Sequence, residues 1–275
     1  MSTVLFDAPG PKARRRHRII AGAFSLILLA AAYWVVDTFR EEGLLTPTVF
    51  NDTFQNRYVE FLLAGFASTL KAAALGIVGS VVFGAVFAMG RLSDHRVLRW
   101  PSVAVVEFFR AVPLVLLILG IWYGYKETIG TLMSLVVALT LYNGSVLAEV
   151  FRAGVNAVPK GQSEASYALG LRKRQVMRMI LMPQAVKFML PAIISQCVII
   201  LKDTSLGFVI LYPEVVRRAR QVALVGDGAV LTYGTIAVVF ILINYSLSKL
   251  AEYLERRLAR KGQHAVKPPN ADVSG

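Results

Sequence analysis

Long apolar blocks separated by polar links dominate the pattern of hydrophobic and polar positions along this chain. An α-helix needs roughly 20 apolar residues to cross about 30 Å of hydrocarbon, and six blocks have about that length. We therefore expect an all-α polytopic membrane protein with six transmembrane helices. The predicted spans are residues 19–36, 61–89, 102–125, 129–151, 188–212 and 231–253.

Basic residues at the ends of these blocks predict the orientation. Lys and Arg gather in four segments that six spans place on one side: residues 1–18, 91–99, 152–187 and 254–275. Because cytoplasmic loops are enriched in Lys and Arg, we expect both termini in the cytoplasm. One outer link breaks the rule, since it carries Arg217, Arg218 and Arg220. These arginines would attract an acidic substrate or dock an acidic rim of another protein.

The first block has two possible readings. Basic residues precede it and residues 30–32 are all alanine, as at the cleavage site of a secretory signal. The block nevertheless continues through Tyr33 and Trp34, aromatic residues that favour the membrane interface. We favour an uncleaved anchor helix over residues 19–39, preceded by a basic cytoplasmic arm.

The second block carries a stripe of small residues at every fourth position. Such a stripe lets another helix backbone approach closely, either within the same bundle or in a homodimer. We favour packing within the bundle. The stripe comprises Ala64, Ser68, Ala72, Gly76, Ser80, Gly84 and Ala88.

Composition excludes several classes of function. The chain is 56% hydrophobic and has a net charge of +13, but no basic stretch is interleaved with base-stacking aromatics, so we expect no nucleic-acid partner. The three histidines have no acids at ligand spacing, and the single cysteine cannot form an internal disulfide. No phosphate-binding loop G-x-x-x-x-G-K-[ST] is present. We expect no metal, no cofactor and no catalysis on this chain, so any ATP would be hydrolysed by a partner.

Charges inside the spans are costly and therefore informative. Glu107 with Arg110, and Glu149 with Arg152, have the i, i+3 spacing of neighbours on one helix face. We favour structural ion pairs for both. The alternative for Arg110 is a place in the translocation pathway.

A polar break interrupts the fifth block between two apolar pieces, neither of which could cross a membrane alone. Such a break is tolerated at membrane depth only where protein or a water-filled cavity surrounds it. We expect the break to line the translocation pathway, with a structural kink as the alternative. Its candidate pathway residues are Lys202, Asp203, Thr204 and Ser205, and it ends at Gly207.

The segment between the fourth and fifth blocks predicts a turn at residues 159–162, followed by a short helix over residues 163–170. Ser163 is a candidate N-cap and Gly170 a left-handed stop. Such a helix is suited to a groove on another protein. The alternative is an amphipathic helix on anionic lipid, attracted by the arginines and lysine at 172–174 and by Arg178.

Motifs in and around this segment resemble a known family. The order Glu164-Ala165-Ser166, then Gly170, then residues 180–183 (I-L-M-P) resembles the EAA loop of ABC importer permeases. The stretches at 109–113, 148–154 and 201–206 resemble the polar amino acid branch, and the whole is similar in look to actinobacterial glutamate permeases. The resemblance covers residues 59–253.

The resemblance implies a permease subunit with a five-helix core at 59–253, to which the first span adds an anchor. It implies partners: a second permease subunit, related or identical, ABC ATPase subunits and an extracytoplasmic binding protein. The substrate would be a polar amino acid, with glutamate the best guess. The alternative is a secondary transporter, which usually shows two related halves. The implied ATPase-coupling residues, in the loop 152–187, are Pro159, Gly161, Gln162, Glu164, Ala165, Ser166 and Gly170.

Overall fold

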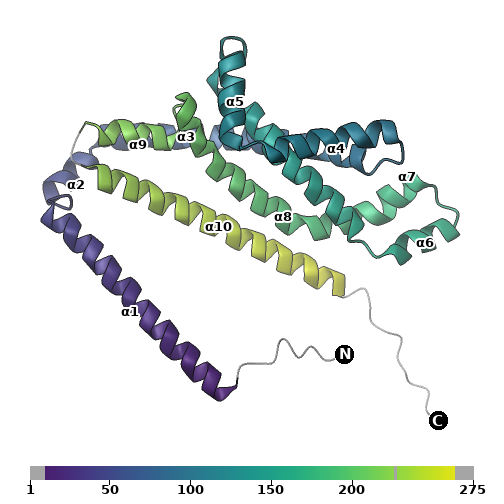
Figure 1. Ribbon diagram of the computed structural model, residues 1–275, viewed down its shortest axis with the longest axis horizontal. Helices are drawn as coiled ribbons and strands as arrows, with labels where there is room; N and C mark the ends of the chain where they lie inside the picture. Colours follow the sequence, from purple (N-terminus) through teal and green to yellow (C-terminus); the bar gives the residue numbers. More distant parts are fainter. Residues whose placement is uncertain (1–9, 226–227, 264–275) are drawn as a thin grey trace.

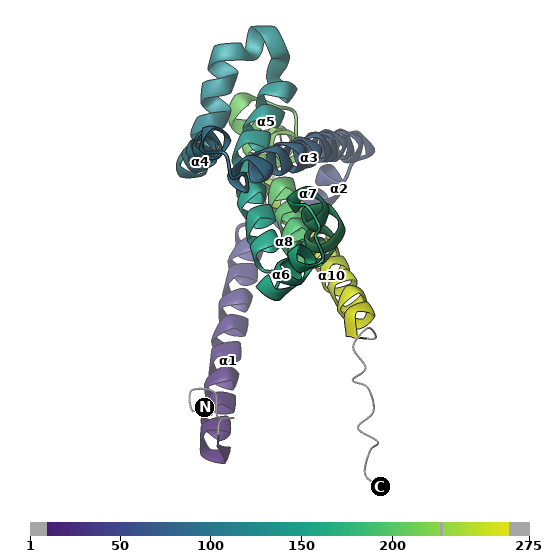
Figure 2. The same ribbon diagram turned by 90° about the vertical axis from the view of Figure 1, so that its right-hand side faces the viewer.

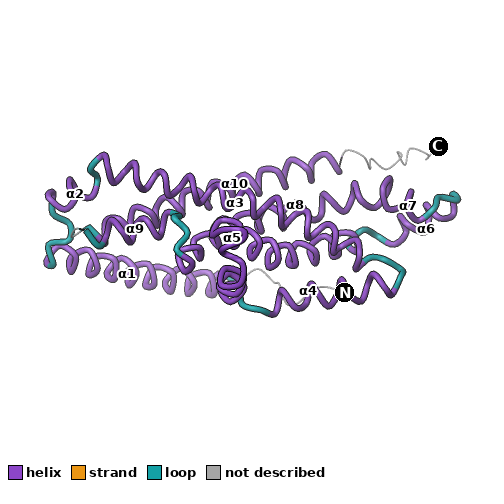
Figure 3. The backbone as a smooth tube through the Cα atoms, turned by 90° about the horizontal axis from the view of Figure 1, so that it is seen from above, coloured by secondary structure: helices purple, strands orange, loops and turns teal. Residues whose placement is uncertain are grey.

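A computed structural model describes residues 10–225 and 228–263. Helices and short links account for this part of the chain, and no strand occurs in it (Figure 3). The helices are α1 (Pro11–Glu41), α2 (Pro47–Thr53), α3 (Asn56–Arg91), α4 (Arg96–Ala111), α5 (Leu114–Asn156), α6 (Lys160–Ala168), α7 (Lys173–Gln175), the π-helical η2 (Val176–Leu181), α8 (Met182–Asp203), the 3-10 helix η3 (Thr204–Ile210), α9 (Val215–Ala223) and α10 (Ala229–Gln263).

Five helical stretches within the described residues are long and apolar enough to cross a membrane. They are Lys12–Glu41, Asn56–Arg91, Leu114–Asn156, Lys173–Ile210 and Ala229–Leu250. The prediction of an all-α polytopic membrane protein is thereby confirmed. The count of six spans stays a prediction.

The third predicted span, residues 102–125, is not one continuous helix. The chain leaves the helical conformation at Val112, whose backbone is extended (φ −81°, ψ 129°), and α5 begins after Pro113. Proline disfavours a helical conformation in the residue before it, which explains the break. The 16 residues of α4 extend about 24 Å, too little to cross the hydrocarbon alone.

The third and fourth predicted spans, 102–125 and 129–151, form a hairpin whose turn lies at Gly130 and not in the short link between the two spans. Gly130 has φ 73° and ψ 171°, a backbone region open to glycine. Figure 2 shows α5 rising from the bundle and folding back. Leu114 and Ile118 of the first arm belong to one buried cluster with Leu135 and Leu139 of the second.

Helix extends beyond three of the predicted span ends. Helix begins at Lys173, within the predicted loop 152–187, and α5 continues to Asn156. The last helix runs on to Gln263, into the predicted tail 254–275. Lys, Arg, Glu and Leu are good helix formers, so a change from apolar to charged residues ends a membrane span without ending the helix.

The small-residue stripe packs against α5 inside the bundle, as expected. A Cβ added at Gly84 would lie 2.9 Å from the Cβ of Leu147 and 3.0 Å from the carbonyl oxygen of Gly144. The hydroxyl of Ser80 donates to the carbonyl oxygen of Leu139 at 3.3 Å. Near the start of α3 the row of buried small residues is displaced by one position, since Gly65 is buried there and Ala64 is exposed.

Helix α1 diverges from the bundle and joins it only through the link to α2 (Figure 1). None of its most apolar 18-residue window is buried in the structure. This separation agrees with an anchor added to a packed core. Whether the anchor is retained or cleaved stays a prediction.

Most of the predicted cytoplasmic segments lie at one end of the bundle. The α3–α4 link, α6, α7 and the C-terminal end of α10 lie toward one end of the molecule, and α2 and α9 lie at the other (Figure 1). Three of the four predicted cytoplasmic segments thus share one end. Residues 1–9, most of the predicted tail, and residues 226 and 227 after α9 lie outside the described residues.

Candidate translocation and coupling sites

The predicted break in the fifth block is present. Helix α8 ends at Asp203, the chain tightens into η3 over Thr204–Ile210, and Leu211 closes it in a left-handed conformation (φ 63°). Neighbouring residues on a helix point about 100° apart, so Lys202 and Asp203 face different surroundings.

Asp203 faces the bundle interior. Its Oδ2 accepts a hydrogen bond from Nδ2 of Asn143 at 3.3 Å, and Oδ1 of Asn143 accepts one from Nε2 of Gln196 at 2.6 Å. Both amides are buried. The chain of bonds ties α8 to α5 at membrane depth, where an unsatisfied polar group is costly. Sequence reasoning missed both amides, although a polar amide inside an apolar block is itself a signal.

Lys202 faces a groove with a volume of about 550 Å³. Ser205 lies beside it and donates its hydroxyl proton to the carbonyl oxygen of Lys202 at 2.7 Å. Within the described residues the ammonium has no ion-pair partner. A lone ammonium on an otherwise largely apolar wall can hold a carboxylate. The rest of the lining is Val216, Tyr233, Ile236, Ala237, Phe240, Ile241 and Asn244, most of it from α10.

Two other predicted pathway residues lie outside this groove. Thr204 is fully buried, and its hydroxyl donates to the carbonyl oxygen of Leu201 at 2.6 Å. Arg110 belongs to a separate charge network at the end of α4, where it lies 3.5 Å from Glu107.

The charge network is larger than the two predicted pairs. The guanidinium of Arg91, at the end of α3, lies 3.1 Å from Glu107 of α4 and 3.1 Å from Glu149 of α5. Glu149 also pairs with Arg152, as its spacing predicted. Arg91 therefore joins three helices, a role that the sequence, which placed it in a basic link, did not reveal.

The predicted short helix begins earlier than expected. Helix α6 starts at Lys160 with Pro159 before it, so the prediction of Ser163 as N-cap is wrong. The Ser163 hydroxyl instead donates to the carbonyl oxygen of Lys160 at 2.7 Å. The turn expected at 159–162 is the first turn of the helix, because proline is compatible with the position just before it.

The end of α6 agrees with the prediction. Gly170 has φ 79°, and its amide donates to the carbonyl oxygen of Tyr167 at 2.9 Å. The amide of Leu171 donates to the carbonyl oxygen of Ser166 at 3.2 Å. These two bonds form a Schellman motif, in which glycine takes the left-handed position.

One side of α6 is open. Glu164 and Ala165 are exposed, and Leu169 beyond the helix is 82% exposed. Ser166 faces inward and donates to the carbonyl oxygen of Gln162 at 2.6 Å. This face of α6 is therefore accessible to a partner.

The outer link contains helix α9, and its three arginines differ in the contacts that their side chains make. The guanidinium of Arg218 donates to the carbonyl oxygen of Phe61 at 3.0 Å and stacks 4.5 Å above the Phe61 ring. It therefore fastens α9 to α3. Arg217 and Arg220 line a separate cavity of about 290 Å³.

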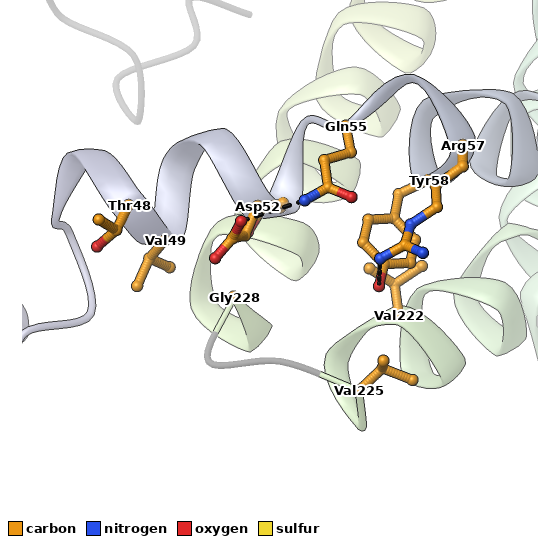
Figure 4. Close-up of a pocket in the computed structure, with 10 residues that line it drawn as sticks. Thr48, Val49, Asp52, Gln55, Arg57, Tyr58, Val222, Val225 and Gly228 are labelled. Atoms are coloured by element: carbon orange, nitrogen blue, oxygen red, sulfur yellow. Dashed lines mark hydrogen bonds between the residues drawn. The ribbon is translucent and has the colours of Figure 1, made fainter.

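A further pocket of about 360 Å³ lies at this outer end, between α2 and the end of α9 (Figure 4). Asp52 accepts a hydrogen bond from Nε2 of Gln55 at 3.1 Å, and the guanidinium of Arg57 donates to the hydroxyl of Tyr58 at 3.1 Å. These polar side chains are thus hydrogen-bonded to close neighbours in the sequence. No predicted site residue lines this pocket.

A bundle of membrane-spanning helices, one of them interrupted, with a short exposed helix at one end, is typical of the subunit of a membrane transporter. Residues 80–260 match the family described as binding-protein-dependent transport system inner membrane component. The chain belongs to this family, the permeases of ABC importers, and within it to the polar amino acid branch.

The similar proteins agree with that assignment. The glutamate transport system permease protein GluD of Corynebacterium glutamicum is 39% identical over 82% of this chain and 85% of its own length. A probable glutamine ABC transporter permease protein, GlnP of Bacillus subtilis, is 34% identical over 76% of this chain and 98% of its own. The solved structure of an amino acid ABC transporter with histidines superposes with a TM-score of 0.69 at 29% identity, covering 73% of this chain and 95% of that one.

Several predictions are thereby confirmed. The chain is a multi-pass permease of the cytoplasmic membrane, and it is a transport subunit and not an enzyme. The family implies an ATPase and a substrate-binding protein as partners. Membership also excludes the alternative of a secondary transporter.

Proposed function

We propose that this chain is the permease of a glutamate importer, in which it pairs with a second permease subunit and is driven by ATPase subunits docked on α6. The observation that carries the substrate is the 39% identity to GluD over most of both chains. The exposed ammonium of Lys202 supports it, because a side-chain carboxylate is what distinguishes glutamate from neutral amino acids.

The groove at Lys202 supports a place in the substrate pathway. Lys202 and Ser205 supply polar contacts on a wall that α10 makes mainly apolar. Asp203 would then act as a positioning residue, because its bond to Asn143 holds the end of α8 in place. We therefore expect Lys202 to contact the substrate and Asp203 to hold the end of α8 in position.

The substrate proposal is tested in proteoliposomes that contain the permease with its ATPase and its binding protein. We expect ATP-dependent uptake of labelled glutamate that excess aspartate inhibits more than excess lysine does. Lys202→Gln should lower glutamate uptake at least tenfold and leave assembly of the complex unchanged. Ser205→Ala, which keeps the ammonium, is the matched control and should cost less. Uptake that prefers lysine, or that is unchanged in Lys202→Gln, would refute this role.

The coupling proposal rests on α6. Glu164, exposed and without an ion-pair partner among the described residues, is available to a partner surface, and Gly170 fixes the direction in which the chain leaves it. We expect ATP to remain on the partner, with this chain holding no cofactor. Two permease subunits would present two such helices to two ATPase subunits.

Reversal of one charge tests the coupling role. Glu164→Lys should abolish stimulated ATPase activity and uptake while the permease still inserts and remains monodisperse. Lys160→Glu changes charge on the same helix and is the control. Normal uptake in Glu164→Lys would disprove docking through this residue without affecting the substrate proposal.

A further inference from the structure

A second groove lies near the coupling segment, beside the α3–α4 link, and the proposed function does not use it. Its volume is about 520 Å³. Methionines from three elements form its apolar floor: Met89 at the end of α3, Met177 in η2 and Met182 at the start of α8. Met89 is 59% exposed and Met182 is 37% exposed. Methionine side chains are flexible and adapt to apolar ligands of irregular shape.

The rim of this methionine groove is basic. Lys173 forms an ion pair with Asp94, which neutralises both charges and joins α7 to the α3–α4 link. The same hydrogen bond lowers the pKa of Asp94 below its ordinary value. Arg174 and Arg178 also line the groove, are exposed, and have no ion-pair partner among the described residues. Two positive charges thus remain uncompensated beside the methionines.

The groove lies where a helix leaves the membrane. Met89 belongs to the apolar spanning helix α3, whereas Asp94 and His95 belong to the polar link just beyond it. One side of the groove therefore faces the hydrocarbon and the other the headgroup layer. On the predicted topology this is the cytoplasmic leaflet, in which anionic lipids attract clustered Lys and Arg.

We propose that the methionine groove binds one anionic phospholipid, with its phosphate between Arg174 and Arg178 and an acyl chain along Met89, Met177 and Met182. Charge complementarity selects this occupant, because two arginines without an ion-pair partner among the described residues match an anionic phosphodiester, while the methionine side chains beside them offer apolar contacts to an acyl chain. The lipid would hold the start of the fifth spanning helix against the α3–α4 link, next to the coupling helix α6.

The test uses the full-length permease in detergent, with phosphatidylglycerol binding measured by native mass spectrometry and by thermal stabilisation. We expect the double variant Arg174→Gln/Arg178→Gln to bind phosphatidylglycerol at least tenfold more weakly than the wild type. The control Arg172→Gln/Arg220→Gln removes two charges from exposed arginines outside the groove and should bind normally. Size-exclusion profiles show whether each variant is folded.

Three ligands distinguish the sources of the anion. Phosphatidylglycerol should bind, whereas phosphatidylcholine and inorganic phosphate should each bind at least tenfold more weakly. Met89→Gln should weaken long-chain more than short-chain phosphatidylglycerol. Equal binding in the double variant, equal binding of phosphatidylcholine, or equal stabilisation by inorganic phosphate would overturn the proposal. Displacement of the lipid by purified ATPase subunits would also overturn it, because the groove would then be part of the ATPase interface.

Discussion

Helices α1 and α3 are almost equally apolar, yet only one of them packs. Their most apolar windows have mean hydropathies of 2.3 and 2.2, but 0% of the α1 window is buried in the structure and 33% of the α3 window is. The difference lies in side-chain size and spacing. Small residues recur at every fourth position of α3. In α1 the row with the same spacing contains the small residues Gly22 and Ala30, but the large residues Leu26 and Trp34 interrupt it. Hydropathy decides insertion, and close approach of backbones decides packing.

The largest effect is expected from filling the α3 seam. Gly84→Leu places a side chain where even a Cβ would be 2.9 Å from Leu147, so α3 and α5 must separate. We expect the free energy of unfolding to fall by at least about 3 kcal/mol and the yield of folded protein to be sharply reduced. The matched control is Gly22→Leu in α1, where an added Cβ meets nothing within 4 Å. Equal melting temperatures of the two variants in detergent would refute this explanation of the difference.

A pH effect is expected at the outer end of α3, where α9 packs. Glu214 is fully buried and accepts hydrogen bonds from the amides of Val216 and Arg217. Burial raises its pKa to about 7 from an ordinary value of 4.5. The pKa of Glu214 is higher in the folded protein than in the unfolded chain. The contribution of Glu214 to the free energy of unfolding is therefore complete below about pH 4.5 and is lost as the pH rises to about 7.

The expected size of this loss is about 3 kcal/mol, since one pKa unit corresponds to about 1.4 kcal/mol. Glu214→Gln should flatten the fall in melting temperature between pH 4.5 and 7. Glu42→Gln, at an exposed position just after α1, should leave the profile unchanged. A wild-type profile that rises over this range would contradict the sign.

The other end of α3 offers a smaller effect. Arg91, in the last turn of α3, contacts Glu107 and Glu149, whereas Arg40, in the last turn of α1, is exposed. Arg91→Gln leaves two carboxylates without their shared partner and should cost roughly 2 kcal/mol. Arg40→Gln should cost little. A double-mutant cycle of Arg91→Gln with Glu149→Gln measures the coupling, which would be near zero if the contact were incidental.

The smallest effect is expected from detaching α1. A protease site introduced at the exposed link after Glu42 would allow α1 to be cut from the purified protein. Because α1 buries almost nothing in the bundle, the free energy of unfolding of the remainder should change by no more than about 0.5 kcal/mol. The melting temperature of the cut protein, compared with that of the uncut protein, measures this change. A large fall would mean that α1 contributes to the packed core.

Local features were predicted well from the sequence. The stop at Gly170, the break after Asp203 and the pairs within one helix face depend on residues a few positions apart. The end of an apolar block does not mark the end of a helix where charged helix formers follow it, as after Tyr253. The boundary at Pro113 was missed because hydropathy does not register the effect of proline on the preceding residue.

The sequence by itself determined that this protein lies in the membrane, and it predicts that the basic ends share one side and that the loop 152–187 carries a coupling segment. Apolar length, charge bias and a short motif are properties of contiguous residues. Only the tertiary structure placed Arg91 between two acids and linked Asp203 to Asn143 and Gln196. These contacts join residues 16 to 60 positions apart, and the rotation and crossing of packed helices decide which side chains meet.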